Sequence, residues 1–175
     1  MLPVKSNEGM LMTDAAPTPQ RPWVPPQYRE VADELFASPT ELRERSWERV
    51  RERLAGEHTY WLATASTDGW PHPRPVWGAW RDGTLVFGLG RGNRTERDLA
   101  RNPRAAIHLT SGEDVVIVEG TVEHIDAASV AHLWQDKYGI SPPDVDRVFF
   151  ALRPHKVLTW DFDELPRSIT SWQFD

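Results

Sequence analysis

The chain has 175 residues, with 20 Lys and Arg against 26 Asp and Glu, which gives a formal net charge of −6. This length fits one domain with a sizeable core, and an acidic chain lacks the broad basic surface that nucleic-acid binding needs. The chain contains no cysteine, which excludes disulfides, thiolate catalysis and cysteine-ligated metals, and it has no apolar run long enough to span a membrane.

The N-terminal segment, residues 1–27, is rich in proline and is expected to form a flexible arm ahead of a single domain over residues 28–175. It carries acidic residues and lacks the apolar region of a secretory signal, so a cytoplasmic protein is the plain interpretation.

Helical segments are expected next. Ser38 and Glu41 form a capping box at a helix start. The apolar residues that follow share one face as far as Leu54, and Gly56 is placed to stop the helical part.

Beyond Gly56 the pattern becomes that of strands. They are expected over residues 58–66, 71–80, 84–89, 105–110, 114–125 and 148–161. Asp68-Gly69 and Asp82-Gly83 mark turns between the first three, and the prolines of the second strand favour an irregular or edge position. Short helices are predicted after Asn93 and after Asp126, each with that residue as its N-cap. Six strands with few helices predict a mainly β fold, an antiparallel barrel whose closure removes exposed edges.

A cationic loop over residues 90–97 is the main candidate site. Its glycines allow close backbone approach, and the helix after Asn93 presents free N–H groups and the positive end of its dipole. Arg91, Arg94 and Thr95 are expected to add hydrogen bonds, and Arg74 on a neighbouring strand to point at the same place, which together make a phosphate site. The sequence supports an alternative about equally well, in which the arginines between positions 91 and 104 form a solvated helix face and bind no ligand.

The order of short motifs resembles the pyridoxamine 5′-phosphate oxidase-like flavin-binding split barrels over roughly residues 58–174. The motifs are G-x-P-H-x-R-P-V (69–76), D-G-x-L-x-F (82–87), a basic loop (91–95), D-L-x-x-N-P-R (98–104) and V-x-V-E-G-T-V (116–122). The segments F-x-L-R-P-x-K-V-L-x-W (150–160) and I-T-S-W-Q-F (169–174) are similar to the same family's C-terminal half.

This resemblance implies a homodimer of six-stranded antiparallel split β-barrels with two cofactor sites between the subunits, holding FMN or the deazaflavin coenzyme F-420. It places Arg74 and Arg94 at the cofactor phosphate, Trp77 along the isoalloxazine ring, and Trp172 of the partner subunit near that ring. The full set of expected cofactor-binding residues is Arg74, Pro75, Val76, Trp77, Phe87, Gly88, Arg91, Asn93, Arg94, Thr95 and Trp172.

Three positions depart from the family pattern. Thr95 replaces a phosphate-binding lysine, Asp98 replaces an asparagine and would repel a phosphate that it faced, and Ser171 replaces an arginine. At roughly 1.5–3 kcal/mol for each charge-assisted hydrogen bond, these changes are expected to lower phosphate affinity. The choice between FMN, the deazaflavin and no cofactor therefore stays open.

No catalytic residue or metal ligand is assigned. The six histidines lack metal-ligand spacing, although His72 lies beside Arg74, and Ser66 and Ser111 have no recognisable base. The leading hypothesis is a flavin-dependent oxidoreductase acting on a small organic substrate, since the flavin itself carries the chemistry. The alternatives are a non-catalytic flavin, haem or small-anion binding protein on the same barrel, and a barrel that serves only as an interaction module.

Overall fold

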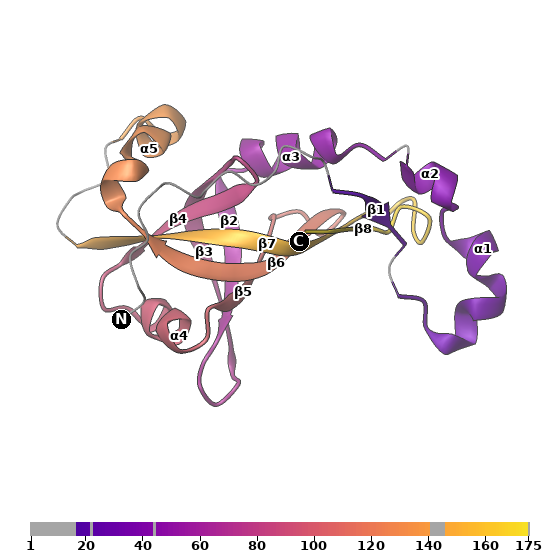
Figure 1. Cartoon of the computed structure of the whole chain (residues 1–175), viewed down its shortest axis with the longest axis horizontal. Helices are drawn as coiled ribbons and strands as arrows, with labels where there is room; N and C mark the ends of the chain where they lie inside the picture. The colour runs from indigo at the N-terminus through magenta and orange to yellow at the C-terminus, as the bar shows by residue number, and fades with distance from the viewer. Residues whose placement is uncertain (1–16, 22, 44, 141–145, 175) are drawn as a thin grey trace.

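The computed structural model describes residues 17–21, 23–43, 45–140 and 146–174 (Figure 1). In chain order the elements are β1 (Pro19–Gln20), η1 (Pro26–Val31), α1 (Ala32–Leu35), α2 (Pro39–Arg43), α3 (Trp47–Gly56), β2 (Thr59–Ala65), β3 (Pro71–Arg81), β4 (Thr84–Gly90), α4 (Arg94–Arg101), β5 (Arg104–His108), β6 (Asp114–Ile125), η2 (Ala127–Ser129), α5 (Ala131–Tyr138), β7 (Arg147–Asp161) and β8 (Thr170–Gln173).

Six antiparallel strands close into a barrel, in the order β7, β4, β3, β2, β5 and β6, with β6 pairing back to β7. β7 makes closure possible because it spans 15 residues. One of its edges pairs with β6 along most of its length, while the other pairs first with β4 and then with β8. The predicted mainly β fold and six-stranded antiparallel barrel are confirmed.

The barrel interior is filled by alternate residues of its strands. In β6, Val116, Val118 and Val122 are buried, as their alternation with polar residues predicts. α3 covers the barrel and adds Val50 and Leu54 to the same core (Figure 1). A second apolar cluster packs α5 against the outer face of β3, β4 and β7.

Local signals set the helix boundaries. Ser38 and Glu41 form the expected capping box, in which the Glu41 N–H donates to Ser38 Oγ (3.3 Å) and the Ser38 N–H donates to Glu41 Oε2 (2.7 Å). A second cap at Ser46, whose Oγ accepts from the Arg49 N–H, begins α3 as a separate helix. Asp126 caps the short η2 and not a continuous helix to Tyr138, so the predicted single helix is two pieces.

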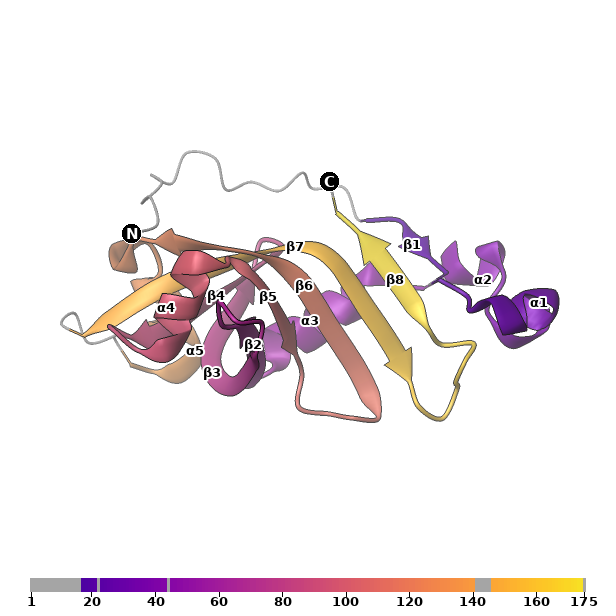
Figure 2. The same ribbon diagram turned by 90° about the horizontal axis from the view of Figure 1, so that it is seen from below.

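The expected hairpin turn at Asp82-Gly83 is present, with both residues at positive φ (49° and 74°). Outside the expected elements, β8 pairs with β7 and with β1, and these two strands extend the sheet beyond the barrel toward α1 and α2 (Figure 2). β1 lies within the segment predicted to be an arm, and residues 1–16 lie outside the described residues. No helix in the described part of the chain has the length and apolarity to cross a membrane.

Candidate functional site

The candidate site begins where β3 and β4 separate. Their pairing runs from Arg81 with Thr84 to Gly78 with Phe87 and then stops. The preceding residues of β3 pair only with β2, while β4 continues along β7 as far as the pair formed by Gly90 and Arg147. The barrel wall is therefore split between residues 71–77 and residues 88–90.

Proline explains why the strands part here. Alternate residues of a strand direct their backbone groups to opposite edges. The unbroken pairing of β3 with β2 uses the N–H groups of His72, Arg74 and Val76, so the prolines between them face the β4 side. In a continued register Pro75 would stand opposite Gly90 and would offer no N–H to it. The expectation of an edge position for these prolines is confirmed for this half of β3.

The split between the two strands forms a depression of about 300 Å³. Its lining residues are Arg74, Pro75, Val76 and Trp77 from β3, Gly88, Leu89 and Gly90 from β4, Asn93 at the start of α4, and Arg147 at the start of β7. The structure thus brings together several residues that are far apart in sequence. Those expected from the sequence are Arg74, Pro75, Val76, Trp77, Gly88 and Asn93.

Two of the expected residues point into the protein interior. Phe87 and Thr95 are both fully buried, and Thr95 Oγ1 has no hydrogen-bond partner among the described residues. Trp172 is also buried, packs against Trp47 with ring centroids 5.6 Å apart, and does not line the depression.

The arginine-rich loop and α4 turn most of their cations outward. The arginines at positions 91, 94, 97, 101 and 104 are all exposed. Arg97 donates to the Gly92 carbonyl oxygen, and Glu96 accepts from the Gly92 N–H, so α4 holds its own loop in place. Arg94 Nε lies 3.7 Å from Asp98 Oδ2. These arginines have the arrangement of a solvated helix face.

The cations of the depression are instead Arg74 and Arg147, and no carboxylate is among its lining residues. Arg147 was missed from sequence because its place depends on the pairing of β7 with β4, in which it stands opposite Gly90. Asn93 adds the start of α4, where it caps the helix by accepting from the Glu96 N–H at 2.8 Å. The depression therefore combines two cations with a helix N-terminus, a combination that binds anions.

Hydrogen bonds connect Arg74 to a buried acid. Arg74 Nη2 lies 3.0 Å from His72 Nε2, and His72 Nδ1 lies 3.3 Å from Asp98 Oδ2. Asp98 is only 5% exposed, so the acid that departs from the family pattern faces inward, toward His72 and Arg94. Arg74 Nε is buried without a partner among the described residues, so its hydrogen-bonding capacity is unsatisfied at the edge of the depression.

An aromatic wall borders the depression. The Trp77 ring is 43% exposed and stacks on Tyr138, with centroids 4.8 Å apart and planes 11° apart. The Tyr138 hydroxyl lies between β2 and β3, accepting from the Gly78 N–H at 2.9 Å and lying 2.9 Å from the His58 carbonyl oxygen. Burial raises the pKa of Tyr138. Trp77 is thus held by Tyr138 and by the edge-on ring of His58, at a centroid distance of 5.7 Å, and the part of it that stays exposed can contact a planar ligand.

Lys137, next to Tyr138, is half-buried and donates from Nζ to the Tyr60 hydroxyl at 3.0 Å. Burial lowers the pKa of Lys137 to about 8 and raises that of Tyr60. Lys137 does not line the depression.

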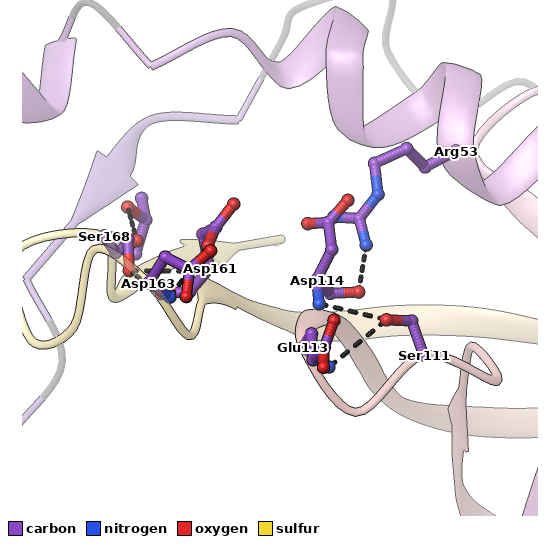
Figure 3. Close-up of polar contacts among 8 residues, drawn as sticks. Arg53, Ser111, Glu113, Asp114, Asp161, Asp163 and Ser168 are labelled. Atoms are coloured by element: carbon purple, nitrogen blue, oxygen red, sulfur yellow. Dashed lines mark hydrogen bonds and ion pairs between the residues drawn. The ribbon is translucent and has the colours of Figure 1, made fainter.

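A larger cavity of about 540 Å³ is lined by residues of α3, by Asp114 at the start of β6 and by Asp161 at the end of β7. Figure 3 shows the polar contacts among some of these residues. Arg53 reaches across the cavity to Asp114, with Nη1 2.8 Å from Oδ1, and Ser168 Oγ donates to the Asp161 carbonyl oxygen at 2.7 Å. Its walls carry both signs of charge, and several of these groups already bind one another. The smaller depression is the better candidate for an anion site because its cations face no acid.

Comparisons with solved structures agree with the fold. An F420 reductase is 26% identical, with a TM-score of 0.51 over 61% of this chain and 94% of that chain. A conserved hypothetical protein from Mycobacterium tuberculosis is 23% identical, with a TM-score of 0.59 over 69% of this chain and 88% of that chain. A heme binding protein from Mycobacterium smegmatis is 21% identical, with a TM-score of 0.57 over 74% of this chain and 59% of that chain.

A comparison with curated protein sequences finds no match. The family model described as pyridoxamine 5′-phosphate oxidase matches residues 46–161, which is more than half of the chain and includes β2 to β7. The chain, with its split six-stranded barrel, therefore belongs to the pyridoxamine 5′-phosphate oxidase family.

Proposed function

We propose that this protein is a flavin-dependent oxidoreductase that binds FMN, or alternatively the deazaflavin coenzyme F-420, in the split between β3 and β4. The observation that carries the proposal is the convergence of Arg74, Arg147 and the start of α4 beside the exposed ring of Trp77, with no acid in the lining. A phosphate fits the cationic part and a flat heterocycle fits the aromatic part.

The residues present suit such a cofactor. Arg74 Nε and the Arg147 guanidinium offer donors to the phosphate, and Asn93 fixes the helix start behind it. Thr95 contributes through its backbone N–H, because its side chain is fully buried. Val76 and Gly88 border the ring and ribityl chain. The bound flavin supplies hydride transfer, and the protein supplies its placement and the exclusion of water.

The other expected residues have smaller parts in this proposal. Phe87 and Trp172 act by packing, since both side chains are buried. Arg91 and Arg94 are exposed near the loop and add positive potential.

A homodimer completes the proposed site. The depression lies at the low end of the range of ~300–1,000 Å³ for ligand sites, as expected if a partner subunit supplies the opposite wall. Trp61 (37% exposed) and Trp77 (43% exposed) are large apolar side chains on β2 and β3. Association of two such faces would cover them. Sedimentation of the purified protein tests this directly, because a monomer at micromolar concentration contradicts it.

The test of the cofactor is a titration of the apo-protein with FMN and, separately, with coenzyme F-420, followed by tryptophan fluorescence. Micromolar or tighter binding with strong quenching is expected for one of them, because Trp77 lies at the proposed ring site. Turnover requires a further assay, in which the bound cofactor is reduced by a nicotinamide or deazaflavin donor. Lack of binding by both refutes the proposal.

The second candidate is a haem carrier on the same barrel, favoured by the similarity to the heme binding protein. In this alternative His108 or His124 is the axial ligand, and His108 stacks on the part-exposed Trp61 with planes 5° apart. An absorbance spectrum of the protein with added haem separates the two functions, since a Soret shift together with no FMN binding favours the carrier.

A further inference from the structure

The guanidinium of Arg74 contacts a histidine that in turn contacts a buried carboxylate, and these three side chains form a relay beside the depression. We infer that His72 and Asp98 are positioning residues that hold Arg74 in the orientation that receives an anionic group, here the phosphate of the cofactor; this inference rests on the proposed function. Neither residue lines the depression itself.

Chemistry fixes the direction of each hydrogen bond in this relay. A guanidinium has only donors, so the 3.0 Å contact makes His72 Nε2 the acceptor for Arg74 Nη2. The imidazole proton is then on Nδ1, which donates to Asp98 Oδ2 at 3.3 Å. An ionised carboxylate accepts only, so Asp98 selects this tautomer of His72.

The fold explains why these three residues meet. His72 and Arg74 are two residues apart on β3 and so project from the same face. The Asn93 cap starts α4 so that Asp98, one turn further along, is buried against His72. Arg94 approaches the same carboxylate from the solvent side at 3.7 Å. The Asp98 carboxylate thus accepts a hydrogen bond from His72 and lies beside the positive charge of Arg94, and Asp98 does not line the depression.

Holding a long side chain in its binding orientation before the ligand arrives increases the affinity for the ligand. A free arginine loses rotamer entropy when it binds, whereas an arginine already held by His72 loses less. The printed contact of Arg74 uses Nη2 alone, so the relay leaves the other donors of a guanidinium that lines the depression unused.

The test compares affinity for FMN with affinity for riboflavin, which lacks the phosphate. His72→Phe keeps an aromatic ring but removes both nitrogens, and it is expected to weaken FMN binding about 10-fold while leaving riboflavin binding unchanged. Asp98→Leu is expected to do the same. Asp98→Asn keeps an acceptor for Nδ1 and is expected to restore FMN affinity. His132→Gln, on the exposed side of α5, is the matched control.

A double-mutant cycle separates positioning from general damage. In an Arg74→Ala background, His72→Phe is expected to have no further effect on FMN affinity, because the residue it positions is gone. The inference is overturned if His72→Phe lowers the affinities for FMN and riboflavin equally. It is also overturned if His72→Phe lowers FMN affinity as much in the Arg74→Ala background as in the wild type. If the wild type binds coenzyme F-420 and not FMN, the comparison is made between that coenzyme and the same deazaflavin without its phosphate.

A spectroscopic measurement on the apo-protein keeps this inference distinguishable from the proposed function. Two-bond ¹⁵N–¹H correlation spectra report the His72 tautomer, and the expected form carries its proton on Nδ1. If the protein binds neither cofactor, the proposed function is refuted, and the His72 tautomer alone then shows whether Arg74, His72 and Asp98 form the hydrogen-bonded relay. A neutral His72 protonated at Nε2 overturns the relay whatever the cofactor result.

Discussion

A substitution at Thr95 tests whether this side chain is a buried part of the core or a ligand of the cofactor phosphate. Its side chain is fully buried at the first turn of α4, and Oγ1 has no hydrogen-bond partner among the described residues. A buried hydroxyl without a partner costs about 1–3 kcal/mol. Valine has the same shape and a similar helix propensity. Thr95→Val is therefore expected to raise the free energy of unfolding by about 1–2 kcal/mol.

The assay is urea denaturation of the apo-protein. The expected result for Thr95→Val is a higher urea midpoint with an unchanged m-value. In thermal unfolding of a domain of this size, each kcal/mol corresponds to a change of about 2–4 °C in Tm. Thr170→Val is the matched control, because Thr170 is equally buried but its hydroxyl donates to the Ser168 carbonyl oxygen at 3.1 Å. That variant is expected to lose about 1 kcal/mol.

Two results would refute this reasoning. Equal destabilisation of Thr95→Val and Thr170→Val would mean that the Thr95 hydroxyl has a partner in solution. A large loss of FMN affinity in Thr95→Val would mean that the hydroxyl reaches the phosphate, as the sequence analysis expects. The structure predicts unchanged FMN affinity, since the side chain is fully buried.

Three further predictions concern other parts of the chain. Arg147→Ala should weaken FMN binding by about 10–100-fold, from the loss of one charge-assisted hydrogen bond, while the exposed Arg104→Ala should change neither binding nor the urea midpoint. Gly120→Ala should cost about 3 kcal/mol by urea denaturation, because its Cβ would overlap the Arg153 carbonyl oxygen where the register between β6 and β7 shifts. A loss below ~0.5 kcal/mol would show that the strands relax there. The pKa of Lys137 is lowered from 10.5 to about 8, so its charged form destabilises the folded state. The free energy of unfolding of the wild type, relative to that of Lys137→Met, should therefore rise as the pH increases from 8 to 10.5. The whole pKa difference between folded and unfolded states would correspond to about 3 kcal/mol, and because Lys137 is half exposed to solvent, which screens its charge, we expect about 1 kcal/mol. A flat difference across that range would contradict the lowered pKa.

Local signals in the sequence predicted most of the fold. The Asn93 cap, the Asp82-Gly83 turn and the alternation in β6 each depend on residues close together along the chain, so the pattern contains the information. The split at β3 was partly predicted for the same reason, because Pro75 itself removes the donor that β4 would need.

The rest of the candidate site depends on contacts between distant segments. Arg147 enters the depression only because β7 pairs with β4, and Asp98 meets His72 only because α4 packs against β2, the neighbour of β3 in the sheet. No periodicity marks either contact. Trp172 was expected at an interface because of its place in the family-like motif near the C-terminal end of the sequence, but its side chain is buried beside Trp47 of the same chain.

The prolines of β3 have a further consequence, for how this protein avoids self-association into sheets. An open strand edge normally invites another chain to add a strand through backbone hydrogen bonds. Here Pro71, Pro73 and Pro75 occupy three of the positions whose N–H groups would face that edge, so an incoming strand finds no donor at these three positions. The split can stay open to a small molecule without becoming a template for aggregation, and a subunit that docks beside it must bind through side chains and not by continuing the sheet.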